Sequence, residues 1–199
     1  MLVIGLTGGI GMGKSTVAKM FAARGIPAFN ADNAVHALQA PNGAAIPAIA
    51  AAFPGTVQNG VLNRPALRNA VLADPAALKR LEKIMHPLVR RAQTQFSAAA
   101  TRMQRRAILL DIPLLFESSI GKGIDKSMDI TITVSCPRDV QIHRVKARGA
   151  MSPEQIATII AKQMPDAEKR RRADVTIRTG LSRFHTLRAV RRLMKDLLP

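Results

Sequence analysis

The sequence has 199 residues, of which 47% are hydrophobic, enough for a sizeable core. Lys and Arg total 30 against 13 Asp and Glu, a net charge of +17 that attracts polyanions, but only 3% of the residues are aromatic, too few for a base-stacking surface. No apolar run approaches the roughly 18 residues of a membrane span. The single Cys136 excludes an internal disulfide. Since the sequence starts directly with a strand, we expect no signal peptide and a cytoplasmic protein that binds no membrane.

Apolar strand patterns and amphipathic helix patterns alternate along the chain, which predicts a parallel sheet with helices on both faces. The predicted strands, in chain order, are Leu2–Leu6, Ile26–Phe29, Ala107–Asp111, Ile130–Val134 and Val175–Ile177. A final amphipathic helix carries Leu187, Val190, Leu193, Met194 and Leu197. We therefore expect an α/β three-layer sandwich with a five-stranded parallel sheet.

Two segments interrupt this alternation. Residues 34–105 carry mainly helical signals and predict a helical insertion between the second and third strands. Residues 140–169 predict a basic helix, a turn at Gly149 and a second helix, whose start is marked by Ser152 and Gln155 around a proline. A basic helix pair of this kind is typical of a mobile lid over a nucleotide. The predicted nucleotide-binding core is then made of residues 1–33, 106–139 and 170–199.

The segment directly after the first strand, residues 8–15, fits the phosphate-binding pattern G-x-x-x-x-G-K-[ST]. Its glycines let successive N–H groups converge on an anion, and the helix that follows adds the positive end of its dipole. Lys14 can reach the β- and γ-phosphates of ATP, and the Ser15 hydroxyl can ligate Mg²⁺. The residues that we expect to contact ATP here are Gly9, Ile10, Gly11, Met12, Gly13, Lys14, Ser15 and Thr16.

Acidic residues follow two of the strands at the edge where ligands of open parallel sheets bind. Asp32 comes after the second strand and is the candidate general base for the hydroxyl that attacks the γ-phosphate. Its alternative role is the N-cap of the next helix. Asp111 ends an apolar run, as a Walker B acid does, and would hold the Mg²⁺ shell or position substrate; alternatively it caps the strand end. Glu117 lies just beyond it.

Basic side chains are the remaining candidates. Arg144 and Arg148 are four residues apart and share one face of the predicted helix, where guanidinium groups suit phosphate oxygens. A solvated basic helix is the alternative, and solvation is also what we expect for the run at residues 169–172. In the insertion, Arg90 faces either an anionic substrate or water, and spacing alone gives His86 no role.

Several of these segments together resemble the dephospho-CoA kinase family. The most specific are residues 5–15 and the sequence D-I-P-L-L-F-E at 111–117. Further matches run in order across nearly the whole chain, at residues 31–32, 86–87, 144, 148, 163–165, 168–169 and 173–174. The resemblance implies ATP-dependent phosphorylation of the ribose 3′-hydroxyl of dephospho-CoA, the last step of coenzyme A synthesis.

The resemblance also implies roles for particular residues. Catalysis would fall to Asp32, Lys14 and Arg144; ATP would contact the phosphate loop together with Arg144 and Arg148; Mg²⁺ would bind Ser15 and Asp111; and the residues near dephospho-CoA would be Asp32, His86, Arg90, Asp111 and Leu114. ATP and dephospho-CoA would be the partners of a monomer that binds no nucleic acid.

The chain departs from the family pattern at three places. Met12 stands where Ser is common, which is tolerable if its side chain faces away from the phosphates. Asn30 replaces the first acid of an Asp-x-Asp pair, so we expect Asp32 to be the essential one. The region of Thr179 often carries Asn in the family, which leaves the adenine contacts open.

Two other functions stay open. Another small-molecule or nucleotide kinase of the same fold is one, although the D-x-P-L-L-F-E segment argues against it. A nucleic-acid-binding ATPase would suit the charge, but the aromatic platform, the zinc motif and the helix-turn-helix signature are missing. The absence of N-K-x-D argues against a GTPase.

Overall fold

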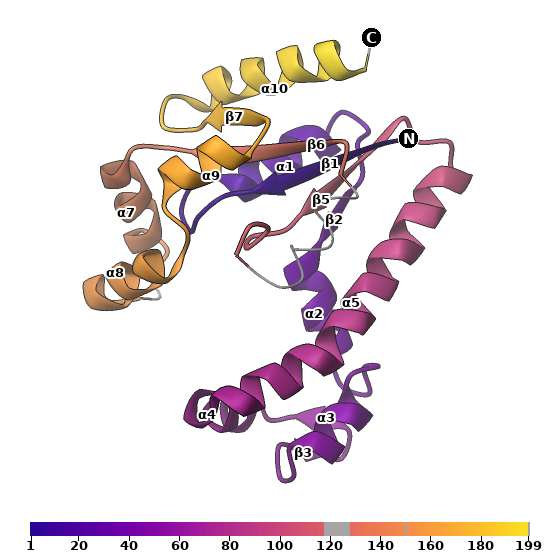
Figure 1. Cartoon of the computed structure of the whole chain (residues 1–199). Helices are drawn as coiled ribbons and strands as arrows, with labels where there is room; N and C mark the ends of the chain where they lie inside the picture. Colours follow the sequence, from indigo (N-terminus) through magenta and orange to yellow (C-terminus); the bar gives the residue numbers. More distant parts are fainter. Residues whose placement is uncertain (118–127, 150, 199) are drawn as a thin grey trace. The chain divides into compact units, whose positions relative to one another are not determined.

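The computed structural model of the chain describes residues 1–117, 128–149 and 151–198 (Figure 1). The chain divides into two compact units. The larger one consists of Met1–Phe29 and Ala100–Pro199, and the smaller one of Asn30–Ala99. No helix among the described residues is long and apolar enough to cross a membrane.

A five-stranded parallel sheet forms the centre of the larger unit, with strand order β2-β5-β1-β6-β7. Its strands are β1 (Leu2–Thr7), β2 (Ala28–Asn30), β5 (Ala107–Asp111), β6 (Ile130–Ser135) and β7 (Val175–Arg178), so all the predicted strands are present. The central strand β1 pairs with β5, which places Leu6 opposite Asp111. On its other side β1 pairs with β6, which places Thr7 opposite Thr133. β2 begins only after Pro27, which has no N–H to donate to a ladder. The carboxyl ends of the central strands therefore meet at one edge.

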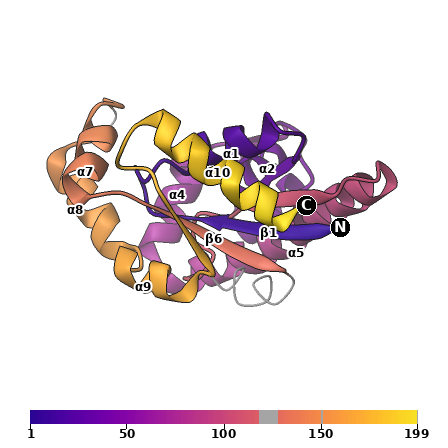
Figure 2. The same cartoon turned by 90° about the horizontal axis from the view of Figure 1, so that it is seen from above.

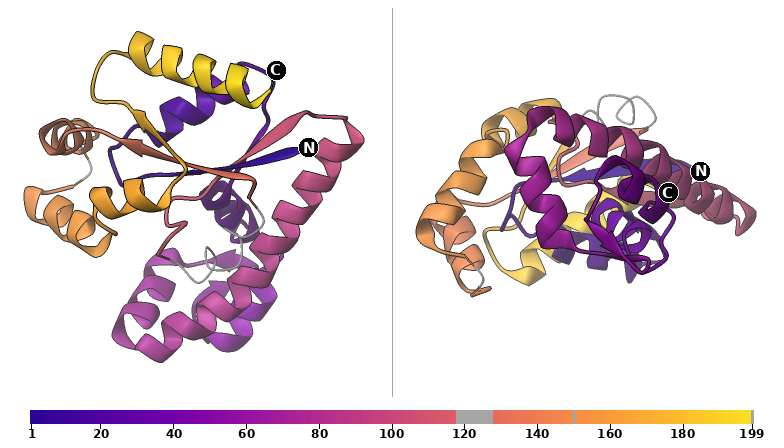
Figure 3. Two further views of the ribbon diagram at one scale, coloured as in Figure 1. Left: turned by 45° about the horizontal axis from the view of Figure 1, so that its top comes forward. Right: turned by 90° about the horizontal axis from the view of Figure 1, so that it is seen from below.

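Helices cover both faces of this sheet. Figures 2 and 3 show α1 (Lys14–Ala22) and α10 (Arg183–Leu197) on one face and α9 (Asp166–Arg172) on the other. The last helix begins at a Ser182 N-cap and turns its predicted apolar positions to the core, with Val190 fully buried. The core between α1, α10 and the sheet includes Ile4, Leu6, Val17, Phe21, Ile132 and Val190. Burial of these side chains drives the packing of the layers.

The segment predicted as a lid contains three helices in place of two. α7 (Arg138–Lys146) is followed by α8 (Pro153–Lys162), which begins as predicted, with a reciprocal capping box between Ser152 and Gln155. The predicted second helix ends early, at Lys162, and α9 starts separately after Pro165. Proline disfavours helical conformation in the residue before it, which separates the two helices.

The smaller unit is mainly helical, as predicted. It holds α2 (Ala31–Leu38), α3 (Ile46–Ala52), α4 (Arg64–Ala73) and most of α5 (Pro75–Arg102), which contains Pro87. An unpredicted antiparallel hairpin of β3 (Val57–Gln58) and β4 (Val61–Leu62) interrupts the helices. Its turn residues Asn59 and Gly60 have φ of 49° and 74°, as a two-residue hairpin turn requires. The core of this unit is formed by Ala45, Ile46, Ile49, Phe53, Leu62, Leu67, Ala77 and Met85.

Candidate active site

The phosphate loop, residues 8–15, turns tightly between β1 and α1. Gly11 has φ of 74°, and a Cβ at this position would lie only 2.8 Å from the backbone oxygen of Gln141. Gly13 is the N-cap of α1, and its oxygen accepts hydrogen bonds from the N–H groups of Thr16 and Val17 at 3.1 and 3.2 Å. The N-terminus of α1 thus opens directly onto the loop, where its dipole favours an anion.

Lys14 and Asp111 form a largely buried ion pair beside the loop. The Lys14 Nζ contacts Asp111 Oδ1, and the two side chains are 13% and 3% exposed. The register of β1 and β5 explains the meeting, since Asp111 lies opposite Leu6, just before the loop begins. Ser15, the next residue on α1, is exposed. A cation, a carboxylate and a hydroxyl are therefore available at the carboxyl edge of the sheet, where phosphate chemistry needs them.

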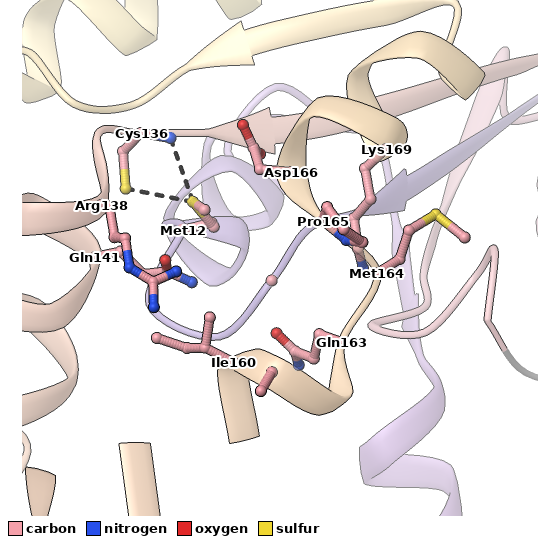
Figure 4. Close-up of a pocket in the computed structure, with 12 residues that line it drawn as sticks. Met12, Cys136, Arg138, Gln141, Ile160, Gln163, Met164, Pro165, Asp166 and Lys169 are labelled. Carbon is pink, nitrogen blue, oxygen red and sulfur yellow. Dashed lines mark hydrogen bonds between the residues drawn. The ribbon is translucent and has the colours of Figure 1, made fainter. Parts of the chain in front are cut away.

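The side chain of Met12 is buried. It is 5% exposed and packs in the core. Its Sδ lies 3.3 Å from the N and 3.4 Å from the Sγ of Cys136, as Figure 4 shows. Burial raises the pKa of the Cys136 thiol, so this cysteine is a protonated packing residue. Replacement of the common Ser by Met12 therefore leaves the backbone donors of the loop in place.

Thr179 ties the loop to the end of β7. Its hydroxyl donates to the Met12 oxygen at 2.6 Å. Arg144 donates from Nη2 to the Thr179 carbonyl oxygen at 2.7 Å and from Nη1 to the hydroxyl at 3.3 Å. Sequence reasoning missed this contact, because nothing in the sequence brings residues so far apart together.

A cavity of about 460 Å³ opens beside Arg144. Arg148 also lines it, but this arginine lies in the turn after α7, which ends at Lys146, and so not on the helix as predicted. The other lining residues include Gly11, Gly13, Thr16, Thr179, Leu181 and Arg183. The two arginines thus share a cavity wall with the phosphate loop.

The expectation that residues 169–172 are all solvated is wrong for the first of them. Lys169 is 1% exposed, and its Nζ lies 2.7 Å from Glu117 Oε1 at angles outside those of a hydrogen bond. Glu117 Oε1 also accepts the N–H of Met164 at 3.0 Å. The other members, Arg170 to Arg172, are exposed and pair with acids of their own helix. Lys169 is buried because its acidic partner comes from another segment.

Three candidates lie in the smaller unit. The first turn of α2 contains Asp32, whose side chain is exposed. Its alternative role as an N-cap is wrong, because Asn30 is the N-cap and accepts the N–H of Asn33 at 2.8 Å. His86 is half-buried on α5, and Arg90, one turn later, is exposed. In the larger unit, Leu114 is 41% exposed in the turn after Asp111.

The central β1, the phosphate loop that follows it and the Lys14–Asp111 pair define a nucleotide-binding protein of the phosphate-loop kinase class. The sequence model of the dephospho-CoA kinase family matches residues 2–182. A dephospho-CoA kinase of Mesorhizobium japonicum is 52% identical over 90% of this chain and 88% of its own length. A dephospho-CoA kinase of Bradyrhizobium diazoefficiens is 48% identical over 100% of this chain and 94% of its own length. The crystal structure of TT1252 from Thermus thermophilus has a TM-score of 0.84, with 34% identity over 100% of this chain and 98% of that one. The chain belongs to the dephospho-CoA kinase family.

Proposed function

We propose that the chain transfers the γ-phosphoryl group of ATP to the ribose 3′-hydroxyl of dephospho-CoA. Membership of the family supports both substrates. The observation that carries the proposal is the phosphate loop beside the buried Lys14–Asp111 pair, in a chain that the family matches from residue 2 to residue 182. Phosphoryl transfer depends mainly on positioning and charge stabilisation, and this loop supplies both.

ATP would bind with its phosphates against the backbone N–H groups of the loop and the N-terminus of α1. Lys14 is held near this position by Asp111, and its ammonium group would turn to the β- and γ-phosphates. Ser15 and Asp111 offer a hydroxyl and a carboxylate oxygen, which are the donors that Mg²⁺ prefers. When bound there, Mg²⁺ would neutralise charge on the β- and γ-phosphates.

The cavity beside Arg144 would hold the nucleoside of ATP. Its volume lies in the range of small-molecule sites, and the loop itself forms one wall. Leu181 is 64% exposed and would be covered by the base. Arg144 and Arg148, which line the same cavity, would neutralise phosphate charge, and Arg144 would also stabilise the charge of the transferring group.

Asp32 would act on the acceptor. Since Asn30 already caps α2, the Asp32 carboxylate is not needed at the helix end and is exposed to a substrate hydroxyl. It would orient the 3′-hydroxyl and take its proton. His86, Arg90 and Leu114 would contribute to the binding of dephospho-CoA.

The protein is also proposed to be a cytoplasmic monomer. The cytoplasmic location is supported by the buried free thiol of Cys136, which fits a reducing compartment. Size-exclusion chromatography with light scattering would measure the mass in solution. A mass of two chains would refute the monomer.

The direct test is product analysis. Wild-type protein with ATP and Mg²⁺ should convert dephospho-CoA to a product with one further phosphoryl group, which phosphorus NMR should place on the 3′-oxygen. Asp32→Asn should lower kcat by about 100-fold or more, since general-base catalysis contributes at least that much, and leave ATP affinity within about twofold. Asn30→Asp is the control and should keep wild-type turnover. Undiminished turnover in Asp32→Asn would remove Asp32 from the mechanism.

A further inference from the structure

Two glutamine side chains hold the main chain of Ile10 inside the phosphate loop. The N–H of Ile10 donates to Gln163 Oε1 at 2.9 Å, and Gln141 Nε2 donates to the Ile10 carbonyl oxygen at 2.8 Å. Figure 4 shows both glutamines beside the loop, Gln141 on α7 and Gln163 just after α8. Both polar atoms of this residue are thus bound by side chains from distant parts of the chain. We call Gln141 and Gln163 the glutamine clamp.

The clamp has firm support on both sides. Gln141 is 3% exposed, and its N–H donates to the Pro137 oxygen at 3.0 Å. Gln163 precedes Met164, whose N–H is held by Glu117 at 3.0 Å. These bonds fix the main chain from which both side chains start, and burial restricts the Gln141 side chain further, so the two amides lose less freedom when they bind the loop.

The loop needs such a constraint at this position. Ile10 lies between Gly9 and Gly11, and glycines allow their peptide planes to rotate at little cost. Rotation at Ile10 would turn a carbonyl oxygen toward a bound phosphate, which would repel it. Within the proposed function, we propose that Gln163 and Gln141 are positioning residues that fix the Gly9–Ile10 and Ile10–Gly11 peptides in the orientation that accepts the phosphates of ATP.

The two hydrogen bonds run in opposite directions, which gives a matched test. Gln163→Glu keeps an oxygen that accepts the Ile10 N–H. Gln141→Glu loses the donor and sets a carboxylate oxygen against the Ile10 carbonyl. Both variants change the charge by the same amount, each beside one of the two peptides that meet at Ile10. A nonspecific effect of charge would therefore alter both, whereas the clamp predicts a difference between them.

We expect Gln141→Glu to raise the KM for ATP and the Kd of a fluorescent ATP analogue about tenfold, and Gln163→Glu to change them less than about threefold. Gln163→Met, which removes the acceptor, should weaken binding about three- to tenfold. When protonated, the carboxyl introduced by Gln141→Glu becomes a donor. The deficit of this variant relative to wild type should therefore shrink as the pH falls toward 5, and that of Gln163→Met should not.

Gln95→Glu, on an exposed position of α5, is the charge control and should bind like wild type. Equal losses in both Gln→Glu variants, or unchanged ATP affinity in Gln141→Glu and Gln163→Met, would overturn the clamp. A variant that does not fold is replaced by Gly9→Ala, whose Cβ would lie 3.1 Å from Gln163 Oε1 and 3.5 Å from Gln141 Nε2 and should weaken ATP binding. The affinity for the nucleotide is measured without dephospho-CoA, so this measurement tests the glutamine clamp alone. A failure of the wild-type protein to phosphorylate dephospho-CoA would refute the proposed function and leave the clamp unaffected.

Discussion

Replacement of Lys169 by Met should destabilise the protein strongly, although the side chain lies outside the phosphate loop. Lys169 is 1% exposed and stands 2.7 Å from Glu117, whose side chain is 17% exposed. Among the described residues, Glu117 Oε2 is buried without a hydrogen-bond partner. Removal of the lysine alone therefore leaves a largely buried carboxylate that has no other ion pair with the part of the chain that the structure describes.

The magnitude follows from the geometry. At 2.7 Å, two unit charges attract by about 6 kcal/mol at an effective dielectric constant of about 20. In the intact pair, the cost of removing both ions from water cancels much of this attraction. When one partner is removed, the other remains buried without compensation, which typically destabilises a protein by about 3–5 kcal/mol. We expect a loss of this size for Lys169→Met. The double variant Lys169→Met/Glu117→Gln should recover at least about 2 kcal/mol, because the orphan charge is gone.

Urea unfolding followed by circular dichroism measures these free energies for wild type, both single variants and the double variant. Arg171→Met is the control, since Arg171 is 78% exposed and its ion pair on the surface is worth about 0–1 kcal/mol. A loss below about 1 kcal/mol for Lys169→Met, or additive effects in the cycle, would refute the reasoning.

Two further predictions concern the loop and the sheet. Gly11→Ala should lower the free energy of unfolding by about 2 kcal/mol or more and weaken ATP binding, because its Cβ would lie 2.7 Å from Val145 Cγ2 and 2.8 Å from the Gln141 oxygen. Gly25→Ala is the control in the same unfolding assay. Gly25 also has a positive φ, but a Cβ there would have no atom within 4 Å, so this variant should cost only about 1 kcal/mol. Asp174 has a lowered pKa, chiefly through the hydrogen bond from the Thr131 hydroxyl and next through that from the Thr131 N–H, each at 2.7 Å. A lowered folded-state pKa stabilises above the unfolded value of about 3.9, and this stability disappears as the pH falls through the folded pKa. Asp174→Asn should thus cost about 1 kcal/mol at pH 7, since the group is exposed, and the difference from wild type should shrink as the pH falls below about 4; a difference that stays constant between about pH 5 and pH 2 would contradict this.

The sheet could be predicted because its signals are local. Four apolar runs mark β1, β5, β6 and β7, and Ser152 with Gln155 marks the start of α8. The hairpin of β3 and β4 also has a local signal, the Asn59-Gly60 pair between Val57 and Val61, which the helical pattern around it outweighed. Its strands have two residues each, too short to show a period.

The contacts around the phosphate loop could not be predicted in the same way. The loop itself has a strong pattern, but the contacts that Gln141, Gln163 and Thr179 make with it have no local signal, because they join segments that meet only in the folded chain. The same holds for Lys169, which looks like one cation of a solvated run until Glu117 is placed beside it. Pairing across the fold, and not composition, decides which charges are buried.

Release of ADP by the purified protein, measured with ATP, Mg²⁺ and one acceptor at a time, tests the central claim most directly. The acceptors are dephospho-CoA, a panel of nucleoside monophosphates, and water alone. We predict rapid ADP release with dephospho-CoA only. Release without acceptor, or preference for a nucleoside monophosphate, would contradict the proposed function while leaving the phosphate loop as an ATP site.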